Sequence, residues 1–265
     1  MIDTLQPNVV DHGIVDEDLL TPAALADAVE RLRPEFVQHH VGSLPTVAPE
    51  GRTRRLPLSA ADVLRGLDTN GCWVMMRRLA TLPEYGELMR RHVRAFDLAL
   101  RARGDAPIQH DLIAFVSAPG ATVPVHYDRD HHLLAQVSGT KVVGAGRFRD
   151  EDEYQRQLER GMFQERLNAD AVPDDAEVHE LGPGEALVLP AYTFHWVNVG
   201  DDVSVAVTFA ITTESTRRAI DVHSCNVHLR RLGLRPAGPG NDRADRMKHR
   251  TMTLARRVRA RASSR

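Results

Sequence analysis

Cysteine is scarce in this sequence, and the two that are present, Cys72 and Cys225, lie far apart along the 265 residues. Their spacing predicts neither a disulfide framework nor a cysteine-based metal site, and it favours a reducing compartment. No stretch approaches the ~20 apolar residues that a membrane span requires. The N-terminus carries early acidic residues and lacks the apolar run of a secretory signal. We therefore expect a soluble, cytoplasmic protein with no membrane partner.

Excess charge is also lacking, because the formal net charge is −2 at pH 7. This balance gives no overall attraction to nucleic acid. The exception is the arginine-rich segment 241–265, NDRADRMKHRTMTLARRVRARASSR. Such a run is usually a solvated helix, so nucleic acid is not the expected partner. Aromatic residues make up only 5% of the chain, so no aromatic cage for a methylammonium group is evident.

The first third of the chain has the pattern of helices. Thr21-Pro22 supplies an N-cap and a first-turn proline for a helix that continues through AALADAVERL. Ser59 caps a second predicted helix, SAADVLRGL, and a third is predicted at about residues 84–103 from its apolar spacing. Residues 42–58 contain proline and glycine without periodicity and are predicted to form a loop. We expect residues 1–105 to form an N-terminal helical region that packs on a core.

From Asp111 onward the pattern changes to short β-type runs separated by turns. The predicted strands are LIAFVS, PVHYD, LLAQVS, KVVGAG, EALVLP, FHWVNV and SVAVTFAI. Gly139-Thr140 lies between two of them, and Gly200-Asp201 is predicted to form a tight hairpin turn. The fold class is therefore mainly β with flanking helices: an antiparallel sandwich or barrel at 106–215, with a helical insert at 150–168, and a basic helical segment at 216–265.

The chemistry is predicted to lie at His126 and Asp128. Residues i and i+2 of a strand point to the same face, so these side chains should face the barrel interior while Tyr127 faces away. His195, at the start of a later strand, is the candidate third ligand. Two histidines and one carboxylate on one side of a metal are typical of non-haem iron(II) oxygenases. Seven other histidines have no matching strand context and are interpreted as non-ligands: His39, His40, His92, His110, His223, His228 and His249.

Lys141 begins a predicted strand of the barrel, where an unpaired ammonium is costly to bury. A carboxylate of a ligand would offset that cost. A lysine exposed beside the Gly139-Thr140 turn explains the same sequence equally well.

Two segments, HYDRDHHLLAQVSGTK (126–141) and PAYTFHWVNVGDDVSVAVTF (190–209), resemble the ligand strands of the JmjC and cupin-like 2-oxoglutarate oxygenases. The similarity is greatest to the asparaginyl hydroxylase that inhibits hypoxia-inducible factor, and it covers about residues 111–212. The resemblance implies a double-stranded β-helix core. It also implies that His126, Asp128 and His195 hold Fe(II), and that O2 and 2-oxoglutarate are consumed.

The resemblance further assigns Lys141 to the distal (C5) carboxylate of 2-oxoglutarate. Thr208 and His132 fall at positions near its C1 carboxylate, where the family more often has asparagine. Val123 stands where the asparaginyl hydroxylase has a threonine that helps to hold the C5 carboxylate. Either another hydroxyl replaces it, with Thr122 or Tyr192 as candidates, or the co-substrate binds more weakly.

The function implied is hydroxylation of an aliphatic C–H bond in an amino-acid, peptide or protein side chain, with release of succinate and CO2. Two alternatives remain open. One is a metal cupin that does not use 2-oxoglutarate, either an isomerase or a dioxygenase, and the other is a non-catalytic binding module. A homodimer through the C-terminal helices is expected only by analogy with relatives.

Overall fold

The structure, a computed structural model, describes residues 2–14, 17–48, 54–162 and 168–263. The strands are β1 (Asn8–Asp11), β2 (Val37–Val41), β3 (Cys72–Met76), β4 (Pro107–Ser117), β5 (Thr122–Tyr127), β6 (His131–Ser138), β7 (Lys141–Gly146), β8 (Glu177–Leu181), β9 (Glu185–Leu189), β10 (Phe194–Val199) and β11 (Ser204–Thr213). The α-helices are α1 (Pro22–Arg31), α2 (Ala60–Arg65), α3 (Leu67–Asn70), α4 (Pro83–Ala102), α5 (Glu151–Met162), α6 (Glu214–Arg231) and α7 (Asp242–Ser263). Short 3-10 helices are η1 (Asp18–Leu20), η2 (Pro34–Phe36) and η3 (Leu79–Thr81).

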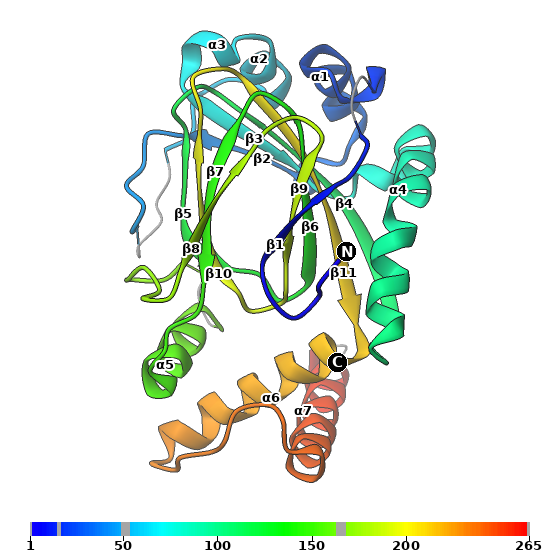
Figure 1. Ribbon diagram of the computed structural model, residues 1–265. Coiled ribbons are helices and arrows are strands. Elements are labelled where there is room, and N and C mark those ends of the chain that lie inside the picture. The colour runs from blue at the N-terminus through cyan, green and yellow to red at the C-terminus, as the bar shows by residue number, and fades with distance from the viewer. Residues whose placement is uncertain (1, 15–16, 49–53, 163–167, 264–265) are drawn as a thin grey trace.

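The strands form two antiparallel sheets that face each other as a flattened barrel (Figure 1). The larger sheet has the order β1-β9-β6-β11-β4-β3-β2, and the smaller one has the order β5-β10-β7-β8. From β4 to β11 the chain passes repeatedly between the sheets, as in a jelly roll. This confirms the predicted mainly β fold with a double-stranded β-helix core and helices at both ends.

The predicted N-terminal helices are present, with the expected caps. Thr21 accepts a hydrogen bond from the amide of Ala24 at the start of α1, and Ser59 does the same for Asp62 in α2. These helices and α4 cover the outer face of the larger sheet (Figure 1). In strand β11, Val205, Val207 and Phe209 pack outward into the hydrophobic core between these helices and the sheet. The alternate residues of β11 therefore face the barrel interior.

The sequence did not predict three strands in the first third of the chain, β1, β2 and β3. They extend the larger sheet, β1 at one edge and β3 with β2 at the other. Strand β8 was also missed, and its exposed, charged sequence EVHEL explains why. The predicted hairpin at Gly200-Asp201 is wrong. It connects β10 of the smaller sheet to β11 of the larger one, so the two strands flanking the turn do not pair.

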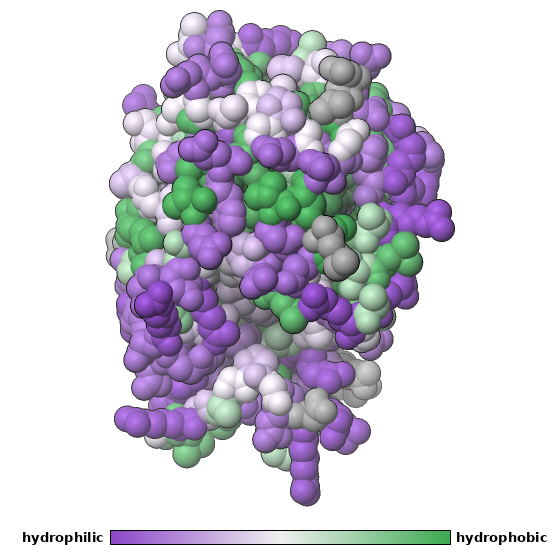
Figure 2. Space-filling model, in the orientation of Figure 1, coloured by the Kyte–Doolittle hydropathy of each residue, from purple (hydrophilic) through white to green (hydrophobic). Residues whose placement is uncertain are grey.

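At the C-terminal end, α6 passes beneath the barrel, and α7 packs against α6 (Figure 1). The fully buried carboxylate of Asp221 on α6 contacts His249 Nδ1 at 2.6 Å and Arg256 at 2.6 Å, both from α7. The face in Figure 2 is mainly hydrophilic, with hydrophobic residues in scattered patches. Among the described residues, no helix is long and apolar enough to cross a membrane.

Candidate metal centre

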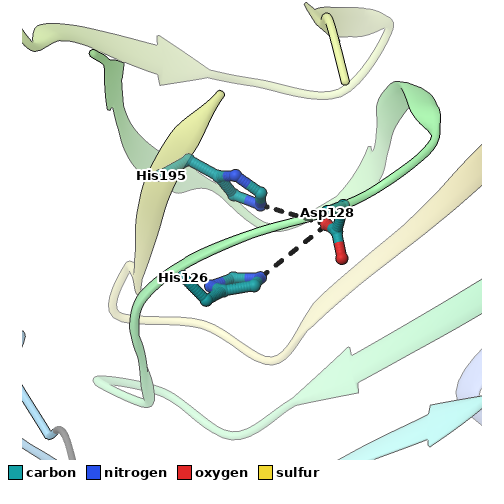
Figure 3. A group of neighbouring side chains, drawn as sticks. All are labelled: His126, Asp128 and His195. Carbon is teal, nitrogen blue, oxygen red and sulfur yellow. Dashed lines mark ion pairs between the residues drawn. The ribbon is translucent and has the colours of Figure 1, made fainter. Parts of the chain in front are cut away.

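Pairing of β5 with β10 places two histidines side by side at one end of the barrel. His126 lies directly across from His195 in the register, and their ring centroids are 4.2 Å apart. A bulge follows this pair, because the next matched residues are Val123 and Val197. Tyr127 points the other way, as predicted, and is buried in a separate cluster with Tyr154, Tyr192 and Phe194. Both imidazoles therefore reach the same space inside the barrel (Figure 3).

Asp128 completes the group, although it follows the last residue of β5 and is not itself within the strand. Its Oδ2 lies 3.8 Å from His126 Nε2 and 3.5 Å from His195 Nε2 (Figure 3). The backbone carbonyl of Asp128 accepts a 2.7 Å hydrogen bond from the amide of Tyr192, which ties this turn to the one preceding β10. One ligand atom from each of the three residues lies within 4.8 Å of the others, which is close enough to share one metal ion.

Backbone carbonyls fix which nitrogen of each histidine is available. His126 Nδ1 lies 2.8 Å from the carbonyl of Pro124, and His195 Nδ1 lies 3.0 Å from that of Thr193. Because a carbonyl only accepts hydrogen bonds, each Nδ1 carries a proton, and Nε2 is the nitrogen left to bind a metal. Such contacts orient histidine ligands in metal sites. Both free nitrogens point at Asp128.

The charge states also suit a metal. Burial, with a smaller contribution from His126, lowers the pKa of His195 to about 3, so the ring is neutral at physiological pH. Burial alone would raise the pKa of Asp128, but His132 and then His126 and His195 outweigh it and hold that pKa well below its usual range. Two imidazoles and one carboxylate form the donor set that non-haem Fe(II) sites use. The residues present therefore fit an iron(II) ion.

A cavity of about 530 Å³ opens beside the triad, between β5 and the β3-β4-β11 part of the larger sheet. His126 and Asp128 line it, whereas His195 is buried behind them. Apolar side chains from β3, β4 and β5 form one part of the wall. Charged side chains gather in another part, namely Arg77, Arg78, Asp111, Arg129 and Asp130. The sequence did not single these out, since charges scattered over loops and strands carry no periodic signal.

Lys141 is buried inside the barrel, with only 4% of its surface exposed. Its ammonium lies 5.8 Å from the ring centroid of Phe115, and among the described residues no carboxylate pairs with it. Burial lowers the pKa of Lys141 to about 7. Lys141 pairs with Val199 in the register, and His195 precedes Val199 by four residues in β10, so the two backbone positions are about 13 Å apart at the usual strand rise. This backbone separation leaves room for a small diacid held at the triad, whose far carboxylate the buried cation can pair with.

The other predicted residues have different surroundings. His132 Nδ1 lies 3.1 Å from Asp128 Oδ2, so it supports the carboxylate of the candidate ligand. Burial alone would lower the pKa of His132, but Asp128 outweighs it and raises that pKa. Thr208 is buried on the interior side of β11, between Ile113 and Leu134. Both therefore lie on the inside of the barrel.

The two candidates to replace a hydroxyl at Val123 lie elsewhere in the structure. Val123 does line the cavity, as expected. The hydroxyl of Thr122 bonds to Asn198 Oδ1 at 3.2 Å. Tyr192 stacks on Tyr127 in the cluster outside the barrel, with ring centroids 5.9 Å apart. Neither residue lines the cavity.

Comparison with known proteins gives similarity at the level of structure alone. No protein-family profile matches the sequence. No curated protein matches it either. Three solved structures of YcfD from Escherichia coli, a ribosomal oxygenase, are similar to the chain. The complex with cobalt and 2-oxoglutarate has a TM-score of 0.53 at 21% identity, over 94% of this chain and 63% of that one.

A second YcfD structure has a TM-score of 0.56 at 20% identity, over 95% of this chain and 64% of that one. The complex with cobalt and succinic acid has a TM-score of 0.52 at 20% identity, with coverage of 94% and 62%. The chain thus spans less than two thirds of the length of these YcfD chains. At such low identity the similarity establishes the fold: the chain has the architecture of this ribosomal oxygenase.

Proposed function

We propose that this protein is an Fe(II)- and 2-oxoglutarate-dependent oxygenase that hydroxylates an aliphatic C–H bond of an amino-acid, peptide or protein side chain. The observation that carries the proposal is the convergence of His126 Nε2, Asp128 and His195 Nε2 beside an open cavity. The unpaired Lys141 inside the same barrel supports the co-substrate. Solved complexes of YcfD with 2-oxoglutarate and with succinic acid, which share this fold, add further support.

In this proposal, His126, Asp128 and His195 hold Fe(II) from one side and leave the opposite side open to the cavity. When bound, iron(II) and 2-oxoglutarate supply the activation of O2, and the overall reaction converts substrate C–H, 2-oxoglutarate and O2 into C–OH, succinate and CO2. Lys141 pairs with the C5 carboxylate, while His132 and Thr208 lie near the C1 end. The protein contributes fixed ligand geometry and a buried, oriented co-substrate.

The charged part of the cavity wall indicates what kind of substrate the cavity accepts. Arg77, Arg78 and Arg129 lie there together with Asp111 and Asp130, so the outer cavity favours a polar substrate. YcfD is a ribosomal oxygenase, and this favours a protein side chain over a free metabolite. Ribosomal proteins are therefore the first substrates to test.

The test is succinate release from 2-oxoglutarate by the Fe(II)-loaded protein in air, with ribosomal proteins as candidate substrates. We expect release to depend on both 2-oxoglutarate and Fe(II). His126→Ala should lower the rate of release at least about 100-fold. Loss of a residue that only supports a metal ligand typically lowers activity about 10- to 100-fold, and loss of the ligand itself should lower it more. His110→Ala is the matched control, since His110 pairs with Asp97 outside the cavity. Normal release by His126→Ala would contradict the proposal, and turnover without 2-oxoglutarate would favour the alternative metal cupin.

A further inference from the structure

Trp73 on β3 has a buried hydrogen-bond donor that the protein itself does not use. The residue is 7% exposed and lines the cavity beside the triad. Its indole Nε1 is buried and has no acceptor among the described residues. An indole nitrogen can only donate, and leaving such a donor unpaired costs about 1–3 kcal/mol. An unpaired donor on a cavity wall therefore points to an acceptor on the ligand.

The position of Trp73 connects it to Lys141 through Phe115. Trp73 pairs with Ser117 of β4, and Phe115 is the next inward-facing residue of that strand, so the two aromatic side chains are diagonal neighbours. The ammonium of Lys141 lies over the ring of Phe115, 5.8 Å from its centroid. One unpaired donor, the ammonium, thus lies over Phe115, and the other belongs to the residue diagonal to Phe115 in the sheet; Val123 lines the same cavity as both aromatic residues.

We propose that Trp73 is a co-substrate-binding residue: its indole N–H donates to the C5 carboxylate of 2-oxoglutarate, beside Lys141, in place of the hydroxyl that Val123 lacks. This inference rests on the proposed function. Thr122 and Tyr192 cannot fill the role, because one is bonded to Asn198 and the other lies in the aromatic cluster outside the barrel. The ring of His40 on the adjacent strand packs beside the indole, with ring centroids 5.1 Å apart.

The experiment measures binding, without turnover, by calorimetry on the full-length protein loaded with Zn(II). The ligands are 2-oxoglutarate and 2-oxobutanoate, which has the same 2-oxo acid end and no distal carboxylate. Trp73→Phe should weaken 2-oxoglutarate binding about tenfold, as expected for a hydrogen bond to a charged group, and leave 2-oxobutanoate binding unchanged. Trp196→Phe is the matched control, because Trp196 packs over Gly144 on the opposite face of β10 from His195.

A rescue variant separates hydrogen bonding from packing. In the Trp73→Phe background, Val123→Thr should recover most of the lost affinity for 2-oxoglutarate, since it adds a hydroxyl to the same wall. Unchanged 2-oxoglutarate affinity in Trp73→Phe, an equal loss for both acids, or failure of the rescue would overturn the role of Trp73 and leave the proposed function standing. Absence of 2-oxoglutarate binding by the unsubstituted protein would instead overturn the proposed function itself.

Discussion

At the scale of single residues, the proposed site depends on a few polar atoms whose roles are set by their surroundings. The carbonyls of Pro124 and Thr193 select the tautomers of His126 and His195. The i, i+2 spacing was sufficient to predict the first two members of the triad. It could not identify Trp73, because an unpaired indole nitrogen is a property of the folded surroundings and leaves no pattern in sequence.

If the proposed function holds, Lys141 should make the binding of 2-oxoglutarate dependent on pH. In the free protein burial lowers its pKa to about 7. A bound carboxylate stabilises the ammonium and raises that pKa. Below pH 7 the lysine of the free protein is therefore already mostly protonated. Above pH 7 binding must first take up a proton, so affinity should fall by up to tenfold per pH unit until the pKa of the complex is reached.

Calorimetry of the Zn(II)-loaded protein between pH 6 and 9 measures this dependence. Lys141→Arg is the control, because arginine stays protonated over that range and its binding curve should have no such decline. If the affinity of the unsubstituted protein for 2-oxoglutarate changed as little with pH as that of Lys141→Arg, Lys141 would not be the partner of the carboxylate.

At the scale of elements, the site is produced by strands that are distant in sequence and adjacent in the sheet. β5 and β10 bring His126 opposite His195, and the bulge in β5 changes the register immediately beyond that pair. The strands themselves were predictable from their β-branched, alternating sequences. Their partners were not: Gly200-Asp201 has the residues of a hairpin turn, yet β10 and β11 belong to different sheets, because pairing depends on the packing of the whole barrel.

The pair of C-terminal helices offers a test that is separate from the site. Asp221 joins α6 to α7 through His249 and Arg256 while fully buried. Asp221→Asn removes the charge from these contacts and should destabilise the attachment of α7 by about 1–3 kcal/mol. Faster amide hydrogen exchange along α7 would reveal the loss, with 2-oxoglutarate affinity unchanged.

Arg246→Gln serves as its control, because Arg246 is an exposed residue of α7 and surface substitutions typically change stability by less than about 0.5 kcal/mol. Unchanged exchange in Asp221→Asn would show that contacts other than this ion-pair cluster hold α7 in place.

At the scale of the whole molecule, one barrel places the triad at one end of β10 and Lys141 beside the other end. The sequence predicted the helical first third and most of the barrel. It missed β1, β2 and β3, since these short strands have no regular alternation and gain their stability from the edges of a sheet already formed. That omission matters, because the cavity wall that carries Trp73 comes from β3.

The central claim is that His126, Asp128 and His195 together hold one iron(II) ion, and metal content tests it most directly. The protein is dialysed under anaerobic conditions against Fe(II), and then its iron is measured. We predict one tightly held iron per chain in the unsubstituted protein and in Asp130→Ala, whose aspartate lines the same cavity outside the triad. Asp128→Ala should retain essentially none. Equal iron binding by Asp128→Ala and the unsubstituted protein would contradict the account.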